Sequence, residues 1–445
     1  MDLKNKKVLL MGLGVLGGGV ATARFLVEQG ADLTVTDLKD KEYLKPSLEK
    51  LEDLKEKINF ILGEHREKDF LESEIIVINP DVSVNNKFVE LAKKNGKQIE
   101  NELTLFYKLC PSKKIIAITG TRGKTTTTNW TYHILKSHYE NTILLGNSPD
   151  KPFLQEIKKI NKDSSVVVEV PSYHLEIVNE HNFKPHIAVI TNLYRDHINR
   201  HKSMEEYAEV KANIFKGQTI EDFLILNYEN EWTDIFRKQN PKSKVLFFSK
   251  KEAETTNLEF INKWGSHNLE NWLASSLVAS VLGVPEQVIQ NSILTLPQIK
   301  FREEKVYKDN HLEIYNDTAA TSPEATMVAI ARFSKGENLI LIAGGTDREL
   351  DFKLWAEVVN KNLKPENLIL LSGSATEKMK KELDWDNFNE FDTLEECLNK
   401  ALEMSNNIKG KVKILFSPGA KSFEKFKNEF DRGEQFNKLV ENIKL

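Results

Sequence analysis

Short apolar runs, each followed by a turn and then a segment of helical periodicity, recur along the whole chain of 445 residues. Apolar runs bounded by turn residues are typical of buried strands, and apolar residues spaced at i, i+3 and i+4 indicate helices. The alternation of the two predicts parallel sheets with helices on both faces. We therefore expect an α/β protein, and the pattern divides into three blocks.

The first block, residues 1–111, predicts a Rossmann-like domain. Its elements are a strand over Lys7–Met11, a helix over about Gly18–Gln29, and strands over Asp32–Thr36 and Ile75–Ile78. The second block, residues 112–298, predicts strands over Lys114–Ile118, Val166–Val170, Ile187–Thr191 and Phe223–Asn227. The third block, residues 299–445, predicts a second Rossmann-like domain with strands over Leu312–Tyr315, Leu339–Ala343, Leu368–Leu371 and Val412–Phe416.

A long helix over Asn268–Leu282 closes the second block. One of its faces is expected to be buried, namely the face formed by Leu269, Trp272, Leu273, Ser276, Leu277 and Ser280.

Composition narrows the function classes. The chain is 40% hydrophobic and 29% charged, and its net charge of −4 argues against a general nucleic-acid binder. Two cysteines, Cys110 and Cys397, exclude a disulfide framework and disfavour a cysteine-based zinc site. The first residues do not read as a signal peptide and no apolar run is long enough to span a membrane, so we expect a cytoplasmic protein without membrane insertion.

The strongest chemical signal is the loop Thr119–Thr126, TGTRGKTT, between a predicted strand and a predicted helix. Gly120 and Gly123 allow backbone N–H groups to turn toward a phosphate, and the helix N-terminus adds a positive dipole. Lys124 can reach the terminal phosphates of a nucleotide, and the Thr125 hydroxyl can bind Mg²⁺. The loop is shorter than the common phosphate-binding pattern, and the alternative is a helix start with an incidental lysine.

In this loop and in seven further motifs the chain resembles the Mur ligases, whose phosphate loop typically reads TGTxGKT. The further motifs resemble the family's strand-end glutamate, N-x-x-x-D-H, H-N-x-x-N, arginine-glutamate, D-(S/T)-x-A-T, G-G-x-D-K and S-P-x-x-x-S … R-G patterns. In chain order they are Val168–Glu176, Asn192–His197, His267–Asn271, Phe301–Glu303, Asp317–Thr321, Gly344–Arg348, and Ser417–Ala420 with Ser422 and Arg432-Gly433.

The resemblance implies three domains and an ATP-dependent amide-bond ligase of cytoplasmic peptidoglycan precursor synthesis. The last three motifs and the length imply addition of D-glutamate to UDP-N-acetylmuramoyl-L-alanine, with ATP and two Mg²⁺ ions, by a monomer. The residues implied for ATP are Gly120, Thr121, Arg122, Gly123, Lys124, Thr125, Thr126, Asn268, Asn271, Arg302 and Asp317. For Asn268 and Asn271, which are i,i+3 neighbours, the alternative is a pair of buried asparagines satisfied locally.

Four residues are expected to hold metal: Thr125, Glu169, His197 and Lys211. Glu169 ends an apolar strand beside the phosphate loop, where open α/β sheets bind ligands. His197 is implied to ligate a second Mg²⁺ or to contact the substrate. With His201 it suggests zinc, but the further ligands of the zinc motif are absent from this segment.

Lys211 lies on a predicted helix capped by Ser203 and Glu206, on the same face as apolar residues. Desolvation there lowers a lysine pKa, and a neutral amine can react with CO₂. In most Mur ligases the matching lysine is carbamylated and helps to hold the second Mg²⁺, so we hypothesise the same here. The alternative is a lysine whose stem is buried and whose amine reaches water.

The turn Gly12–Gly17 has the dinucleotide form G-x-G-x-x-G, and Asp37 follows 20 residues later. Taken alone this predicts NAD binding, so a non-catalytic NAD-binding regulator is an alternative function, although it leaves Lys124 without a role. The resemblance instead implies a site for the uridine diphosphate of the substrate. Its implied contacts are Val15, Leu16, Asp37, Leu38, Lys39, Asn147 and His197.

The third block is implied to bind the amino acid through Thr321, Arg348, Ser422 and Phe423. Two positions depart from the family pattern, because Ala319 and Arg348 stand where lysines are usual. One hypothesis is that Lys421 compensates. A second alternative is therefore a related ligase that adds a different amino acid. The two-step reaction also requires domain closure, for which hinges near residues 111 and 298 are predicted.

Overall fold

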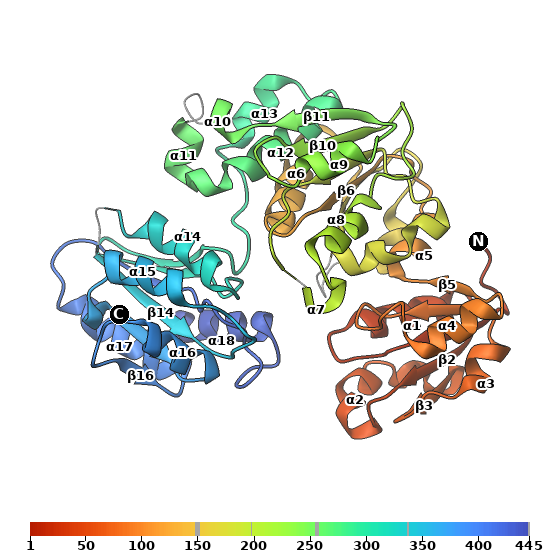
Figure 1. The fold of residues 1–445 in the computed structure, drawn as a ribbon, viewed down its shortest axis with the longest axis horizontal. Helices are drawn as coiled ribbons and strands as arrows, with labels where there is room; N and C mark the ends of the chain where they lie inside the picture. The colour runs from red at the N-terminus through yellow and green to blue at the C-terminus, as the bar shows by residue number, and fades with distance from the viewer. Residues whose placement is uncertain (147–151, 197, 254–257, 336–337, 444–445) are drawn as a thin grey trace. The chain divides into compact units, whose positions relative to one another are not determined.

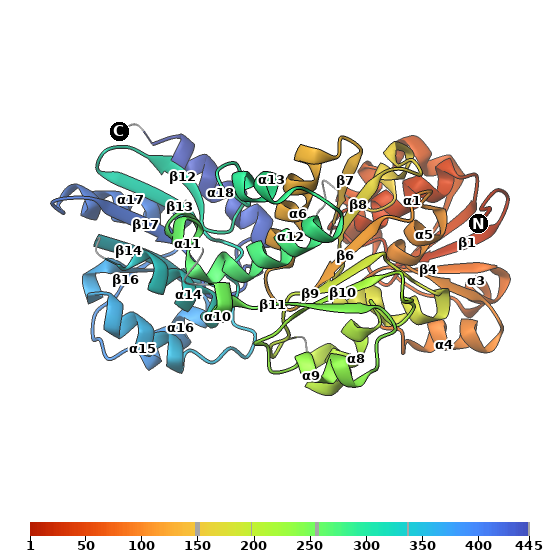
Figure 2. The same cartoon turned by 90° about the horizontal axis from the view of Figure 1, so that it is seen from above.

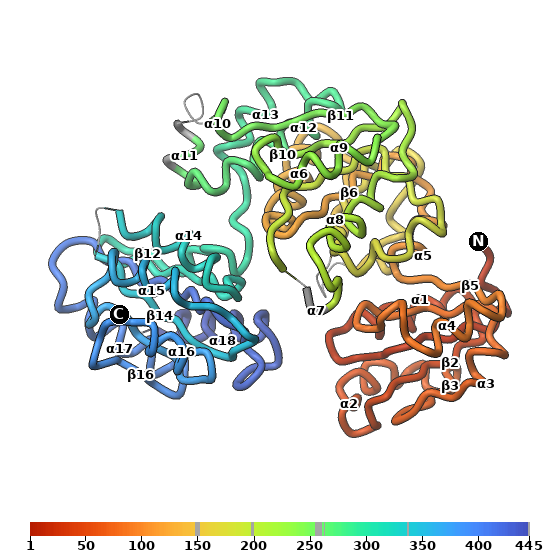
Figure 3. The backbone as a smooth tube through the Cα atoms, in the orientation of Figure 1, coloured from red at the N-terminus to blue at the C-terminus, as the bar shows by residue number. Residues whose placement is uncertain are grey.

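The computed structural model describes residues 1–146, 152–196, 198–253, 258–335 and 338–443 (Figure 3). The chain forms two compact units, Met1–Pro297 and Gln298–Leu445, and each is described by itself. The first unit contains two sheets and the second contains one (Figure 1). The α/β class is confirmed, whereas the three domain ranges given above stay predictions.

The N-terminal sheet of the first unit is entirely parallel, in the order β3-β2-β1-β4-β5. Its central strand buries four successive residues, as strands covered on both faces do. Its strands are β1 (Lys7–Met11), β2 (Asp32–Asp37), β3 (Ile58–Leu62), β4 (Ile75–Ile78) and β5 (Gln98–Glu100). Its helices are α1 (Gly18–Glu28), α2 (Lys41–Glu49), α3 (Glu67–Glu72), α4 (Lys87–Lys94) and α5 (Glu102–Leu109).

The second sheet of this unit is also parallel, in the order β11-β10-β9-β6-β8-β7. Its strands are β6 (Ile115–Thr119), β7 (Thr142–Leu145), β8 (Ser165–Glu169), β9 (Ile187–Ile190), β10 (Phe223–Asn227) and β11 (Lys244–Phe248). Its helices are α6 (Lys124–His138), α7 (Ile198–His201), α8 (Met204–Ala212), α9 (Thr233–Lys238), α10 (Lys250–Ala253), α11 (Leu258–Trp264), α12 (Leu269–Val281) and α13 (Glu286–Ser292). Because β6 lies between β9 and β8, the segments that follow these three strands meet at one edge.

The second unit has the sheet order β12-β13-β17-β14-β15-β16, in which only β12 is antiparallel to its neighbour among the described strands. Its strands are β12 (Glu304–Lys308), β13 (Leu312–Asn316), β14 (Asn338–Gly344), β15 (Leu368–Leu371), β16 (Asn389–Phe391) and β17 (Val412–Phe416). One face is covered by α14 (Pro323–Phe333), α15 (Lys353–Asn362) and α16 (Ser374–Glu382), the other by α17 (Leu394–Asn406) and α18 (Glu429–Glu441) (Figure 2).

The predicted strands are confirmed. Five have the predicted bounds, and the others differ by one residue at one end or at both ends, where strand ends fray. The buried face predicted for α12 is confirmed at Leu269 and Trp272 and wrong at the other four residues. Ser280 is exposed, Leu273, Ser276 and Leu277 are only partly buried, and the buried residues are Leu269, Asn271, Trp272, Ala274, Ser275, Val278 and Ala279.

The reason for this difference is the close packing of α12 along α6 (Figure 2). Small side chains let two helices approach, and buried polar groups are tolerated when they are hydrogen-bonded. The Ser275 hydroxyl donates to the Thr127 carbonyl (3.1 Å), and the Thr127 hydroxyl donates to Asn271 Oδ1 (3.2 Å). Polar residues therefore form much of this contact face.

Within the described ranges, every helix is too short or too polar to cross a membrane.

Candidate active site and amino-acid pocket

The phosphate loop connects β6 to α6 and depends on two glycines. Gly120 has φ +149° and Gly123 has φ +81°. A Cβ at Gly120 would lie 1.9 Å from Thr191 Oγ1, and a Cβ at Gly123 would lie 2.1 Å from Asn271 Oδ1. Both contacts are far inside van der Waals distance, so the loop requires glycine at both positions for space as well as for conformation.

Residues that follow β9 hold this loop from one side. Thr121 N donates to Asn192 O (3.0 Å), Arg122 N donates to Asn192 Oδ1 (2.9 Å), and Thr191 Oγ1 donates to Arg122 O (2.7 Å). The Arg122 guanidinium lies over the ring of Tyr194, 5.5 Å from its centroid. Asn192 and Tyr194 belong to the motif Asn192–His197, but the motif alone predicts no role for either residue. The missing signal was strand order, which a single sequence does not contain.

Lys124 is the first residue of α6. Its ammonium group donates to the carbonyls of Gly120 and Thr121, both at 3.0 Å, and therefore lies over the loop that was predicted to bind phosphate. Thr125 and Thr126 follow it in the first helical turn, and Thr126 is buried. The loop, the lysine and the helix N-terminus thus have the arrangement that anion binding needs.

Glu169 ends β8, the strand that pairs with β6, and it lies opposite Ile118 in the register. Its side chain is largely buried, with 8% exposed. The Glu169 carboxylate and the Thr125 hydroxyl are hard oxygen donors of the kind that Mg²⁺ prefers. No group of three His, Cys, Asp or Glu residues gathers to bind a metal among the described residues. His197 and Asn147 lie outside those residues.

Lys211, on α8, is almost completely buried at 1% exposure and also approaches the loop. Its amine donates to Gly120 O (2.9 Å) and to Thr119 Oγ1 (3.4 Å), and it lies 4.6 Å from the centroid of Tyr207. Burial, and next the nearby charge of Lys124, hold the pKa of Lys211 well below its usual value, while Asp196 acts in the opposite direction. The predicted buried lysine is therefore present.

His201 plays a structural part in this region. Its ring stacks on Tyr207 with centroids 5.0 Å apart, and its Nε2 lies 3.1 Å from Ser172 Oγ. Both ring contacts are internal to the fold.

Asn268 and Asn271 lie together at the start of α12. Asn271 Nδ2 donates to Asn268 Oδ1 (3.0 Å), and Asn268 Nδ2 donates to the Trp264 carbonyl (3.1 Å). Because Asn271 also accepts from Thr127 of α6, the pair connects the start of α12 to the first turns of the phosphate-loop helix. Their role toward adenine stays a prediction, and this local bonding is what the alternative interpretation describes.

The glycine turn of the N-terminal sheet is shaped by Asp37. Asp37 Oδ2 accepts from the backbone N–H groups of Leu13 (2.8 Å) and Gly14 (3.1 Å), and Oδ1 accepts from Lys39 N (2.8 Å). This carboxylate is thus bonded to the turn itself. An acidic residue that binds a ribose would instead keep its oxygens available for the ribose hydroxyls.

The apolar residues around this turn are unusually exposed. Leu16 is 58% exposed and Leu38 is 62% exposed, whereas Val15 packs partly against the core. The Lys39 ammonium lies over the ring of Tyr43, 5.1 Å from its centroid. Two exposed leucines beside a glycine turn offer an apolar surface to a flat ring.

Asp317, in the second unit, follows β13 and is buried. Its Oδ2 accepts from Ser417 Oγ (2.7 Å) and its Oδ1 accepts from Glu303 N (3.1 Å). Burial and next the charge of Glu303 raise the pKa of Asp317 to about 8. Arg302 acts in the opposite direction on the same carboxyl, so the two predicted nucleotide residues of this unit lie near each other.

Two loops that follow β14 and β17 form the predicted amino-acid region. Thr346 and Lys421 bridge them through two backbone hydrogen bonds, of 2.9 and 3.1 Å. Arg348 places its guanidinium 4.8 Å from the ring centroid of Phe423, which joins two of the predicted residues. Lys421 Nζ donates to Thr321 Oγ1 (3.1 Å), which brings a third predicted residue to the same loops.

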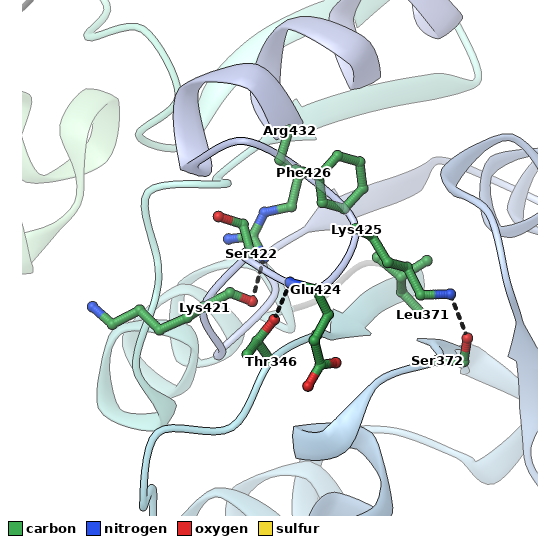
Figure 4. A pocket seen from close by; sticks show the side chains of 10 residues that line it. Thr346, Leu371, Ser372, Lys421, Ser422, Glu424, Lys425, Phe426 and Arg432 are labelled. Carbon is green, nitrogen blue, oxygen red and sulfur yellow. Dashed lines mark hydrogen bonds between the residues drawn. The ribbon is translucent and has the colours of Figure 1, made fainter. Parts of the chain in front are cut away.

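A shallow, tightly packed depression lies between these loops (Figure 4). It is lined by Gly345, Thr346, Leu371, Ser372, Lys421, Ser422, Glu424, Lys425, Phe426 and Arg432. Ser422 is 3% exposed, and its hydroxyl has no hydrogen-bond partner within the described part of the chain. A buried hydroxyl without a partner is costly, so its position is consistent with a ligand contact.

Arg432 forms the floor of this region and had no predicted role. It is fully buried and donates to the Thr318 hydroxyl (2.9 Å) and to the carbonyls of Thr318 (2.9 Å), Ala420 (3.2 Å) and Lys421 (3.1 Å). Burial lowers its pKa to about 10, so it stays charged at neutral pH. The closing R-G motif was the available signal, but a motif does not reveal that the arginine binds backbone carbonyls.

Family models match both sheets of the first unit. The model described as "Mur ligase MurD-like, N-terminal domain" matches residues 6–101, and "Mur ligase middle domain" matches residues 118–279. Among solved structures, UDP-N-acetylmuramate-alanine ligase from Thermotoga maritima has a TM-score of 0.60 at 17% identity and covers 98% of this chain and 99% of its own. The Thermotoga maritima MurF ligase, solved in complex with ADP, has a TM-score of 0.58 at 15% identity, covering 99% and 96%. These likenesses show the fold.

Curated relatives match over the full length. Proteins named "UDP-N-acetylmuramoylalanine--D-glutamate ligase" are 35% identical in Roseiflexus sp. (strain RS-1), covering 100% of both chains, and 34% identical in Borreliella afzelii (strain PKo), covering 99% of both. The protein of the same name from Clostridioides difficile (strain 630) is 33% identical, covering 100% of both. With this identity along its whole length, the chain belongs to the Mur ligase family, in the group of UDP-N-acetylmuramoylalanine--D-glutamate ligases.

Proposed function

We propose that the chain joins D-glutamate to UDP-N-acetylmuramoyl-L-alanine in an amide bond at the expense of ATP, in peptidoglycan precursor synthesis. The observation that carries this proposal is the phosphate loop with Lys124 over it, next to the strand that ends in Glu169. The full-length relatives supply the choice of substrates. An NAD-binding regulator would leave this loop without a role.

The proposed reaction has two steps. An oxygen of the substrate carboxylate attacks the γ-phosphorus of ATP, and the bond from this phosphorus to the β,γ-bridging oxygen breaks. ADP departs with that oxygen, and the substrate becomes an acyl phosphate. The amine of D-glutamate then attacks the acyl carbon, phosphate leaves with its oxygen, and the amine gives up a proton. Positioning and electrostatic stabilisation dominate phosphoryl transfer, so the charge of Lys124 beside the loop suits the first step.

The donors near the loop fit Mg²⁺, because Glu169 and Thr125 offer oxygens at adjacent strand and helix ends. Bound there, Mg²⁺ would neutralise charge on the phosphates. His197 and Lys211 are the proposed ligands of a second ion, the lysine as a carbamate. Burial of the Lys211 amine, which favours its neutral form, supports the modification. Crystal density for an unmodified amine at Lys211, in crystals grown with bicarbonate, would exclude it.

The site proposed for the UDP part of the substrate is the glycine turn of the N-terminal sheet. The glycine turn with Val15, Leu16, Leu38 and Lys39 receives the uridine diphosphate part, with Asp37 shaping the turn. Asn147 and His197 are also proposed to contact this substrate.

Arg302, Asp317, Asn268 and Asn271 are proposed to complete the nucleotide site, and the loops with Thr321, Arg348, Ser422 and Phe423 to bind D-glutamate. A monomer in the cytoplasm, without nucleic-acid partners or membrane insertion, remains our prediction.

The test is product identification by mass spectrometry after incubation with ATP, Mg²⁺, UDP-N-acetylmuramoyl-L-alanine and single amino acids. We expect D-glutamate to give the amide product and to stimulate ADP release. Because Ala319 and Arg348 depart from the family pattern, the amino acids tested include L-glutamate, D-aspartate and L-alanine. A product with one of these and none with D-glutamate would replace the proposed amino acid but retain the ligase.

A further inference from the structure

D-glutamate carries two carboxylates, and cations whose own partners are easily given up bind such groups through strong charge-assisted hydrogen bonds. The search for two such cations rests on the proposed function. It can be carried out in the second unit, because several lysines and arginines lie on the loops and helices that follow β14, β15 and β17.

Most of these cations are already committed. Lys378 pairs with Asp347 at 2.6 Å, and Lys425 bonds to Ser372 Oγ (2.7 Å), to the Asp392 carbonyl (2.7 Å) and to the Asp392 carboxylate (3.4 Å). Arg432 is fully buried and bonded to carbonyls of the Lys421 loop. To bind a substrate carboxylate, each would have to break an ion pair or leave buried carbonyls without donors, which is unfavourable.

Lys421 differs from these residues in its partner. Its amine donates to the neutral hydroxyl of Thr321 at 3.1 Å, and this is a bond that a carboxylate can replace or share at little cost. Figure 4 shows the Lys421 side chain extending away from Glu424 and Phe426, so that its charge is presented away from that acidic residue.

The backbone of Lys421 is fixed. Both backbone groups bond to Thr346 across the loop bridge, and Arg432 also donates to the Lys421 carbonyl (3.1 Å). A cation mounted on a fixed backbone loses less conformational entropy when it binds than one on a free loop.

Arg348 is the second cation of these loops with a neutral partner. It belongs to the loop that Thr346 bridges to Lys421, and its guanidinium lies on the ring of Phe423, two residues after Lys421. Between Lys421 and Phe423 in the sequence is Ser422, whose buried hydroxyl has no hydrogen-bond partner among the described residues. One pair of bridged loops therefore carries both cations and a hydroxyl without a partner.

We propose that Lys421 binds one carboxylate of D-glutamate and Arg348 the other, so that Lys421 supplies the positive charge that the usual lysine of the D-(S/T)-x-A-T motif would provide at position 319. Lys421 is then a specificity-determining residue of this chain, and Thr321 holds its amine in place until the amino acid binds. The site thus keeps its positive charge, but the lysine that provides it follows β17, whereas Ala319 follows β13.

The test compares the full-length Lys421→Met and Lys425→Met variants with the wild-type chain. Loss of a charge-assisted hydrogen bond is expected to raise the KM for D-glutamate about 10- to 100-fold in Lys421→Met. The KM values for ATP and for UDP-N-acetylmuramoyl-L-alanine should stay within about twofold. Lys425→Met removes a lysine that lines the same depression but is paired with Asp392, so its KM for D-glutamate should also stay within about twofold.

The first half-reaction gives an independent readout. Exchange of isotope between the bridging and non-bridging oxygens of ATP, measured with the UDP substrate and without amino acid, should be unchanged in Lys421→Met. Lys421→Arg, which keeps the cation, should retain most of the affinity for D-glutamate. The proposal is overturned if Lys421→Met keeps the wild-type KM, if Lys425→Met raises it equally, or if Lys421→Arg loses as much affinity as Lys421→Met. Absence of D-glutamate turnover in the wild-type chain would instead refute the proposed function.

Discussion

The first prediction concerns the charge of a single residue. Lys124→Ala removes the ammonium that lies over the phosphate loop, and loss of such a preorganised charge is expected to lower kcat about 100- to 1,000-fold. Lys136→Ala is the matched control, because Lys136 lies in the last turn of the same helix and is exposed. ADP release in the presence of all substrates measures both. Equal rates of ADP release in the two variants would show that the Lys124 charge, and with it the phosphate loop, takes no part in the reaction.

His174 gives a prediction about pH. It is buried, both of its ring nitrogens are without hydrogen-bond partners among the described residues, and burial lowers its pKa from 6.5 to about 3. Between pH 6.5 and pH 3 the His174 ring binds a proton in the unfolded chain but not in the folded chain. The free energy of unfolding is therefore highest above pH 6.5 as far as His174 is concerned, and it decreases as the pH falls below that value. By pH 5 this histidine alone should destabilise the fold by about 2 kcal/mol.

A comparison of variants isolates this effect. His174→Leu removes the titration, so the wild-type chain should lose about 2 kcal/mol more than the variant between pH 8 and pH 5 in urea unfolding followed by tryptophan fluorescence. The buried carboxyl of Glu102, whose pKa burial raises to about 7, acts in the opposite direction but is present in both proteins and cancels. Parallel pH profiles would mean that the His174 pKa is not depressed.

At the scale of single residues, chemistry was easier to predict than contacts. Lys124, Glu169 and Lys211 were identifiable because their residue types and spacing reflect what phosphate and metal binding require. The bonding of Asp37 to its own glycine turn, and of Lys421 to Thr321, was not predictable in this detail. The second contact joins residues 100 positions apart, and only the strand order β13-β17-β14 brings their loops together.

The contact between α12 and α6 gives a prediction at the scale of elements. Ala274 is fully buried in α12, next to Ser275, which bonds to α6, and a larger side chain there must displace its packed neighbours. Ala274→Leu should destabilise the first unit by about 1–3 kcal/mol. It should also weaken nucleotide binding, because Asn271 and Thr127 bond across the same contact. Thermal unfolding and ATP titration measure the two effects.

Ser280→Leu is the control for this prediction. Ser280 lies on the same helix but is exposed, so an added leucine should change stability by less than about 0.5 kcal/mol. The face first predicted from hydrophobic periodicity included Ser280 and would give the opposite result. A larger loss for Ser280→Leu than for Ala274→Leu would therefore favour the periodic face over the structural one.

Strands were predictable to within a residue, whereas helix faces were not, and the difference is physical. A strand buried on both faces, such as β15, is apolar along its whole length and can be predicted without knowledge of its neighbours. The buried face of α12 contains Asn271 and Ser275 because α6 offers them hydrogen-bond partners. Hydrophobicity alone cannot identify a face that is buried through polar contacts. The antiparallel pairing of β12 likewise depends on its partner strand.

The division into two compact units gives a prediction for the whole molecule, through Arg432. This arginine lies wholly in the second unit, where it satisfies the carbonyls of Thr318, Ala420 and Lys421. Arg432→Met keeps most of the apolar stem but leaves the buried carbonyls of Thr318 and Ala420 without this donor, at a cost of about 3 kcal/mol or more. Because each unit has its own hydrophobic clusters, the loss should stay within residues 298–445.

Hydrogen exchange read peptide by peptide distinguishes local from global loss. Peptides from β13, β14 and β17 should lose protection in Arg432→Met, while peptides from β6, β8 and α6 should exchange as in the wild-type chain. Lys427→Met, an exposed change a few residues before Arg432, is the control and should leave both sets unchanged. If β6 and β8 lost protection together with β17, the two units would unfold as one cooperative body, and damage to the amino-acid loops would then also reach the phosphate loop.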